Sequence, residues 1–358
     1  MDAQPRAAIT AAIRATGPIG FDRFMELALY EDGGFYVDPP IGVDEGRAFA
    51  TSPHVHPVFG QLLAAGILEL WDGLGRPEPF VLTEVGAGDG TLAGRLIEAL
   101  AEIPLTYVAV ERSPGAQDAL RQVSGVRLAE QPSGAHVVLG HELLDNLPFR
   151  RVRMTTDGPR EIRVGLETER FVEVLADLDP GLLTPAQRSF AEPGDETVVP
   201  VGAFRFIDEL AAGSPAEGMY AVLIDYGAEG HPGGPVHGYA GHRLVEDVLA
   251  DPGSSDITVG VDFSLLADHA RAAGLIATPS RTQRQILTAL GFERWTREEL
   301  ARQTTFLDER KGIEAVRAWS GRQSASLLVD PAGLGRLRWM LLATPGLAIP
   351  SWMADDSV

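Results

Sequence analysis

The fold is decided by the stretch Phe80-Val81-Leu82-Thr83-Glu84-Val85-Gly86-Ala87-Gly88-Asp89-Gly90-Thr91-Leu92. Its first half is an apolar run typical of a buried strand, and its second half carries three alternating glycines. A strand that leads through such a turn into a helix leaves unpaired backbone N–H groups, with little side-chain bulk, at the carboxyl edge of a sheet. Nucleotide-like ligands bind at this edge in open α/β folds, so we expect an α/β protein with a ligand site here. A purely structural turn is the alternative.

The spacing of the glycines separates two classes of cofactor. A dinucleotide fingerprint needs Gly-x-Gly-x-x-Gly, whereas these glycines lie at 86, 88 and 90 and position 91 is Thr. With the acidic residue in front, the pattern resembles the motif of class I S-adenosylmethionine (SAM) methyltransferases. That resemblance implies a Rossmann-like sheet in which four residues bind SAM, namely Glu84, Gly86, Gly88 and Gly90.

A second acidic residue follows the next β-rich run. Leu105–Val110 reads as a short strand and ends in Glu111, about 20 positions past the glycines. A carboxylate at that place accepts hydrogen bonds from the two adjacent hydroxyls of a ribose. We therefore predict that Glu111 binds the cofactor. The alternative is a surface residue that caps the helix opened by Ser113-Pro114.

The composition indicates a folded protein of one large domain or two ordinary ones, with 358 residues of which 45% are hydrophobic. No apolar run reaches the length of a membrane span, and the first residues lack the pattern of a signal or transit peptide. We expect a cytoplasmic bacterial protein without a membrane partner. The absence of cysteine excludes disulfides, thiolate metal sites and a cysteine nucleophile.

The charge argues against one class of partner. Fifty acidic and thirty basic residues give a formal net charge of −20. An acidic surface repels nucleic-acid phosphates and anionic lipids, and no local basic patch is visible, so we expect no nucleic-acid partner. Lys311 is the only lysine, which suggests a GC-rich bacterial genome more than a function.

Five stretches in the first part of the chain carry a family resemblance: Leu29-Tyr30, Gly33-Gly34-Phe35-Tyr36, Thr51-Ser52-Pro53, Phe59-Gly60 and Glu84 to Leu92. Together they resemble the MidA family of SAM-dependent methyltransferases. Its mitochondrial members are protein arginine methyltransferases needed for assembly of respiratory complex I. The resemblance continues downstream over most of the chain. It implies SAM as cofactor, a protein or peptide arginine as methyl acceptor, and a place for Ser52 and Pro53 at the cofactor site.

Paired acids follow what we read as the fourth strand, in His141-Glu142-Leu143-Leu144-Asp145-Asn146-Leu147-Pro148. Glu142 and Asp145 are three apart, so one helical turn aims both carboxylates the same way. Two carboxylates can orient a guanidinium and offset its charge, which assigns both residues a catalytic role. A helix cap or a solvated acid is the alternative. Family members carry Asn at 141 and aromatics at 143 and 144, so the pocket here has a different shape.

A third group of polar residues follows the strand from Met219 to Ile224. It is Asp225-Tyr226-Gly227, which matches the family pattern. The resemblance assigns catalytic roles to Tyr226 and to His242 in the loop that follows. Histidines at 231, 237 and 242 suggest a metal site, but no carboxylate-His spacing of a metal helix accompanies them, so we expect none. Asp262 is expected to cap the helix that continues to residue 273, with substrate contact as the alternative.

The sequence thus predicts a class I methyltransferase core over 76–148 and 218–358. Residues 1–75 form a helical cap with a lid loop at 38–50, and an α+β insertion over 149–217, rich in antiparallel ribbon, faces the substrate. Residues 180–215 are expected to be helical, and Arg336–Thr344 to be an edge strand. A small-molecule or biosynthetic-peptide acceptor stays open, as do a non-catalytic assembly factor and a homodimer.

Overall fold

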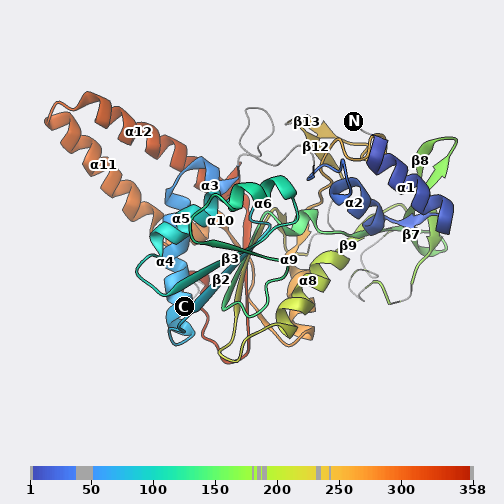
Figure 1. The fold of residues 1–358 in the computed structure, drawn as a ribbon, viewed down its shortest axis with the longest axis horizontal. Helices are drawn as coiled ribbons and strands as arrows, with labels where there is room; N and C mark the ends of the chain where they lie inside the picture. Colours follow the sequence, from blue (N-terminus) through green and yellow to red (C-terminus); the bar gives the residue numbers. More distant parts are fainter. Residues whose placement is uncertain are drawn as a thin grey trace.

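The computed structural model describes residues 3–37, 51–179, 181–183, 187, 192–230, 235–241 and 243–354. Two larger sheets and the helices around them make up the body, and one helical hairpin extends away from it (Figure 1). The helices are α1 (Ala3–Thr16), α2 (Phe21–Tyr30), α3 (Ser52–Val55), α4 (Val58–Gly73), α5 (Thr91–Ala99), α6 (Pro114–Leu120), α8 (Val201–Ala212), α9 (Phe263–Ala272), α10 (Gln283–Ala289), α11 (Phe292–Asp308) and α12 (Gly312–Ser326), with short 3-10 helices η1 (Leu144–Asn146), η2 (Leu327–Val329), η3 (Leu334–Arg336) and η4 (Ser351–Met353).

The larger sheet has the order β15-β17-β10-β5-β2-β3-β4, with β16 also paired to β17. Strands β4, β3, β2, β5 and β10 run parallel, and β17 runs antiparallel to β10. This sheet confirms the predicted α/β class. Its strands are β2 (Phe80–Val85), β3 (Leu105–Val110), β4 (Val126–Ala129), β5 (Val137–His141), β10 (Tyr220–Asp225), β15 (Ile276–Ala277), β16 (Arg281–Thr282) and β17 (Arg338–Ala343).

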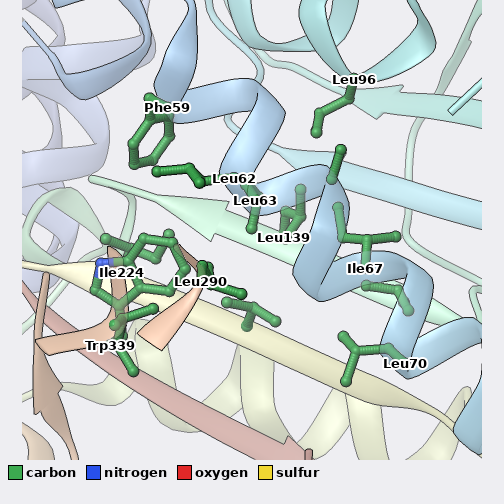
Figure 2. Close-up of a cluster of buried hydrophobic side chains, with 14 of the residues drawn as sticks. Phe59, Leu62, Leu63, Ile67, Leu70, Leu96, Leu139, Ile224, Leu290 and Trp339 are labelled. Carbon is green, nitrogen blue, oxygen red and sulfur yellow. The ribbon is translucent and has the colours of Figure 1, made fainter. Parts of the chain in front are cut away.

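Helices cover both faces of the larger sheet. On one face α4 is apolar on the side that meets the strands, and it packs with α5 and α10 over β5, β10 and β17. Figure 2 shows this cluster, in which Phe59, Leu63 and Ile67 of α4 point toward Leu139, Ile224 and Trp339 of the strands. On the other face α8 and α9 pack against the same strands. Because side chains pack against both faces, the sheet and its carboxyl edge are held in place.

The second sheet is built from the insertion and from the start of the chain. Strands β6, β7 and β8 form the expected antiparallel ribbon, with β9 beside β6 and β1 beside β7. Helices α1 and α2 pack on this sheet, while α4 packs on the larger one. The N-terminal segment is thus shared between the two sheets, and the division into three parts stays a prediction. The strands are β1 (Ile19–Gly20), β6 (Arg150–Thr155), β7 (Gly158–Glu167), β8 (Arg170–Asp177) and β9 (Glu196–Val199).

Two expectations about single elements are wrong. The strand expected at the edge, β17, lies inside the sheet, because β15 and β16 pair with its outer side near its two ends. Within the region expected to be helical, Gln187 and Val201–Ala212 are helical among the described residues, but Glu196–Val199 is a strand. Local patterns did not reveal these pairings, since both depend on partners distant in sequence.

Short strands complete the fold. They are β11 (Gly227–Ala228), β12 (Gly238–Ala240), β13 (Arg243–Val245) and β14 (Val261–Asp262), which form two small two-stranded sheets. Asp262 caps α9, since its Oδ1 accepts the N–H groups of Ser264 and Leu265 at 3.0 and 3.2 Å, as expected. In the part of the chain that the structure describes, no helix combines the length and the apolar character that a membrane crossing requires.

Candidate active site

The glycine loop joins β2 to α5 in a left-handed conformation. Gly86, Gly88 and Gly90 have φ values of +72°, +54° and +81°. A Cβ at Gly90 would lie 2.9 Å from Val123, so that glycine allows close packing, whereas a Cβ at Gly88 would meet nothing within 4 Å. At Gly88 the loop therefore offers bare backbone facing open space, which fits a cofactor that lies against it.

Glu111 ties this loop to the end of β3. Its Oε2 accepts the N–H of Gly88 at 2.9 Å, and its Oε1 accepts the N–H groups of Arg112 and Ser113 at 2.7 and 2.8 Å. The carboxylate thus lies beside the open side of Gly88, where the sequence placed the ribose contact. The cap of α6 is Ser113, whose Oγ accepts the N–H of Ala116, and the cofactor role of Glu111 stays a prediction.

Glu84 lies inside the core. Its side chain is buried and accepts the hydroxyl of Tyr107 at 2.5 Å, from the neighbouring strand. Burial raises the pKa of Glu84 to about 8, while the Tyr107 hydrogen bond acts to lower it. The acidic residue of the motif therefore fastens β2 to β3. Direct contact of its carboxylate with SAM stays a prediction.

Helix α3 lies against the glycine loop through a residue that the sequence reasoning missed. His54 Nε2 is 3.0 Å from Asp89 Oδ2, and Thr51 Oγ1 lies 2.8 Å from His54 Nδ1. Hydrogen bonds from His54 and Thr91 lower the pKa of Asp89 to about 2 even though its burial acts to raise it. A pair formed by a loop aspartate and a distant histidine has no sequence signal.

The predicted residues of α3 lie deeper. Ser52 is fully buried and donates from Oγ to Gln283 Oε1 at 3.2 Å, which joins α3 to α10. Pro53 is buried in the first turn of α3. Their place beside the cofactor site stays a prediction, while their packing role is visible.

Glu142 stands at the end of β5 in a strained conformation. Its φ is +51°, which is unusual for a residue with a side chain, and such strain concentrates at functional sites. Its buried Oε1 lies 3.7 Å from the buried Nε2 of His141, and neither atom has a hydrogen-bond partner in the part of the chain that the structure describes. Burial, with the charge of Asp145, raises the pKa of Glu142 to about 8, and burial lowers the pKa of His141 to about 3.

Asp145 and Asp225 are held together by the turn at η1. Asp225 Oδ2 accepts the N–H groups of Leu144 and Asp145 at 2.7 and 3.2 Å. The carboxyl of Asp145 accepts the Thr258 hydroxyl at 2.8 Å. Burial raises the pKa of Asp145 to about 6, and burial with the charge of Asp145 raises that of Asp225 well above its usual range. The sequence-predicted pair at 142 and 145 therefore belongs to a larger group of buried acids.

Asp256 is a further member of this group. It accepts the N–H of Tyr239, and burial raises its pKa to about 7 with a contribution from the charge of Asp145. Tyr36 stacks on Tyr30 with ring centroids 5.5 Å apart, and burial, with Tyr30, Asp256 and Asp145 nearby, raises its pKa well above the usual value. The aromatic residues at 30–36 belong to the stretches that carry the family resemblance.

Tyr226 follows β10 next to the acids. Burial and the charge of Glu142 raise its pKa, and the Arg336 guanidinium lies over its ring at 5.6 Å. His242 lies outside the described residues, as do His231 and the loop expected at 38–50. Among the described residues, no three His, Asp or Glu side chains are grouped so that they could hold a metal ion.

Comparisons with known proteins agree with this geometry. The family model described as "Putative S-adenosyl-L-methionine-dependent methyltransferase" matches residues 62–279. The "Protein arginine methyltransferase NDUFAF7, mitochondrial" of Mus musculus is 29% identical over 320 residues, which are 78% of this chain and 72% of the mouse protein. The Homo sapiens protein of that name is 30% identical over 71% of this chain and 66% of its own length.

A solved structure extends the likeness to nearly the whole fold. A protein from Burkholderia thailandensis, bound to S-adenosyl-homocysteine, is 25% identical and covers 98% of this chain and 94% of its own, with a TM-score of 0.81. S-adenosyl-homocysteine is what SAM becomes when it gives up its methyl group. SAM is therefore the cofactor here, while its contact with the glycine loop stays a prediction. Because the family model covers more than half of the chain, this protein belongs to the family of SAM-dependent methyltransferases.

Proposed function

We propose that this methyltransferase N-methylates an arginine of a protein or peptide. One observation carries the proposal, namely four carboxyl groups gathered in one buried site. Burial is the first cause of the raised pKa of all four, Glu142, Asp145, Asp225 and Asp256, and the charge of Asp145 further raises the pKa values of the other three. Among the described residues, no arginine or lysine forms an ion pair with any of them. The site is built to receive a cation.

A guanidinium fits the chemistry of this site better than a point charge does. It is a planar cation with five N–H donors, and it can give parallel hydrogen bonds to carboxylates. Among the described residues Glu142 Oε1 has no hydrogen-bond partner, so it can accept an N–H from the substrate. Asp145 is already oriented by Thr258, which fixes the direction in which it meets the acceptor. Together they would hold one nitrogen facing the cofactor.

SAM supplies a methyl group on a sulfonium sulfur when it is bound. The backbone at Gly86, Gly88 and Gly90 and the carboxylate of Glu111 would hold it. The chain's own contribution is then position and charge, because methyl transfer needs an aligned lone pair more than a strong base. Glu142 Oε1 can take the proton that the acceptor nitrogen gives up at mildly basic pH, where a carboxyl with a pKa of about 8 is ionised.

The named relatives support the same class of acceptor. The mouse and human proteins are named protein arginine methyltransferases, and each aligns with more than two thirds of this chain. A second candidate acceptor is a small molecule or a biosynthetic peptide. It is favoured by His141, whose buried Nε2 has no partner among the described residues and could accept a bond from a different donor.

The test uses peptides that differ in one residue. The purified protein, SAM with a deuterated methyl group and a library of single-arginine peptides are incubated together, and each peptide has a copy with lysine in place of arginine. We expect deuterated methyl on arginine peptides and none on the lysine copies. Equal labelling of both sets, or labelling of neither while SAM binds by calorimetry, would contradict the arginine proposal. Titration with NAD is the matched control for cofactor binding.

A further inference from the structure

The hairpin of α11 and α12 extends from the body as an arm, which we define as residues 292–326 (Figure 1). The two helices pack mainly on each other, with α10 and η2 at their base. Their shared side is closed by small residues of α12, namely Ala315, Ala318 and Ala325, which are buried. The outer side of α12 has no partner within the described part of the chain.

That outer side is apolar. Ile313, Val316 and Trp319 are 69%, 62% and 50% exposed, and their spacing of three places them on one stripe of the helix. Among the described residues, eleven large hydrophobic side chains are exposed, and five of them lie in the arm. Scattered exposed leucines need no explanation, but a contiguous stripe on an isolated helix is typical of an interaction surface.

The charge of the arm differs from that of the whole chain. Between residues 292 and 326 the sequence carries six acidic and seven basic side chains, while the chain as a whole has a net charge of −20. Two copies of such an acidic chain repel each other over most of their surfaces. The arm is the segment through which they can approach without this repulsion, and its extension keeps the acidic bodies apart.

The stripe is also complementary to itself. A two-fold axis that crosses α12 at Val316 pairs the helix with an antiparallel copy and sets Ile313 against Trp319 of the second copy. A heterologous partner would not require this symmetry within one helix.

From these observations we propose that two copies of this chain form a dimer through the outer face of α12, centred on Val316. In this dimer the stripe of Ile313, Val316 and Trp319 packs against the same stripe of the second copy. The proposal is independent of the methyl acceptor, because the arm carries none of the residues assigned to SAM or to the acceptor.

Sedimentation equilibrium of the full-length protein, over a wide range of concentration, tests the proposal. Val316→Glu adds a charge at the centre of the contact on both copies and should raise the dissociation constant about 100-fold or more. Leu244→Glu is the matched control, because Leu244 is an equally exposed apolar residue of β13. We expect the unmodified chain and the control to be dimers at concentrations where Val316→Glu is a monomer. A chain that is monomeric throughout, or a Val316→Glu variant that dimerises like the control, would overturn the proposal.

The absence of cysteine from the sequence permits a sharper test of the geometry. In Val316→Cys, the introduced thiol is the only one in each chain, and the two-fold axis brings two of them together. Oxidised glutathione should then produce a covalent dimer of Val316→Cys and none of Leu244→Cys. Failure of Val316→Cys to link, in a chain that sediments as a dimer, would show that another face forms the contact.

Discussion

Glu84→Gln separates the structural role of the motif's acidic residue from contact with the cofactor. Glu84 is buried and accepts the Tyr107 hydroxyl, and burial raises its pKa from the usual 4.5 to about 8. Below pH 4.5 the Glu84 carboxyl is protonated in both the folded and the unfolded chain. Between pH 4.5 and about 8 the unfolded chain releases this proton and the folded chain keeps it. The stability contributed by this group is therefore lost as pH rises from about 4.5 to about 8.

The size of the effect follows from the width of this window. One retained proton changes the free energy of unfolding by about 1.4 kcal/mol per pH unit. Between about pH 5 and about pH 7.5 the unmodified chain should lose about 3 kcal/mol from this residue alone. The amide of Glu84→Gln does not ionise, and its oxygen can still accept the Tyr107 hydroxyl. The variant should lack this loss and become the more stable protein at the upper pH.

Urea unfolding at several pH values measures the effect directly. Glu102→Gln is the matched control, because Glu102 is exposed and its replacement should leave the pH dependence as it is. Parallel pH slopes for Glu84→Gln and the unmodified chain would refute the reasoning about burial. Calorimetry with SAM gives the second readout, in which retained affinity indicates a structural role and a loss of affinity indicates direct contact with the cofactor.

Three further predictions concern the site. For the unmodified enzyme kcat/KM should rise with pH up to about 8, because Glu142 must ionise to hold a cation. Glu142→Gln should lose that rise and react about 100-fold more slowly. Identical pH profiles for the two proteins would remove Glu142 from the acceptor site. Glu111→Gln keeps an oxygen but no charge, so calorimetry should show about tenfold weaker SAM binding, and unchanged affinity would refute the ribose assignment. Gly90→Ala places a Cβ 2.9 Å from Val123 at a φ of +81°, whereas Gly17→Ala, the control, has a φ of +82° and nothing within 4 Å of its Cβ. Gly90→Ala should therefore destabilise the folded protein by about 1–3 kcal/mol more than Gly17→Ala. Equal melting temperatures of the two variants would show that the contact with Val123 relaxes freely.

Much of the larger sheet could be predicted because its signals are local. The apolar runs at 80–85, 105–110 and 126–129 are strands with those bounds, and polar groups directly after the strands meet at the carboxyl edge. Glu142 and Asp145 come together for this reason. The antiparallel ribbon was also visible, since its turns at Asp157-Gly158 and near Glu169 are marked by turn residues.

What could not be predicted depends on pairing between distant segments. Strand β1 joins β7 through Ile19 and Val164, a contact that no local pattern announces, so the N-terminal helices were read as a separate cap. The inward direction of Glu84 depends on the neighbouring strand that supplies Tyr107. The bond from Thr258 to Asp145 joins segments more than a hundred positions apart. The acidic group is therefore larger than the pair that the motif revealed.

The central claim is that the acidic site receives the guanidinium of a protein or peptide arginine. The most direct measurement incubates the purified protein with methyl-labelled SAM and an extract of cells that lack it, followed by complete acid hydrolysis of the proteins and amino-acid analysis. The account predicts that the label is recovered in methylated arginine and that Glu142→Gln abolishes it. Label recovered only in another amino acid, or only in small molecules that the hydrolysed proteins do not contain, would contradict the account.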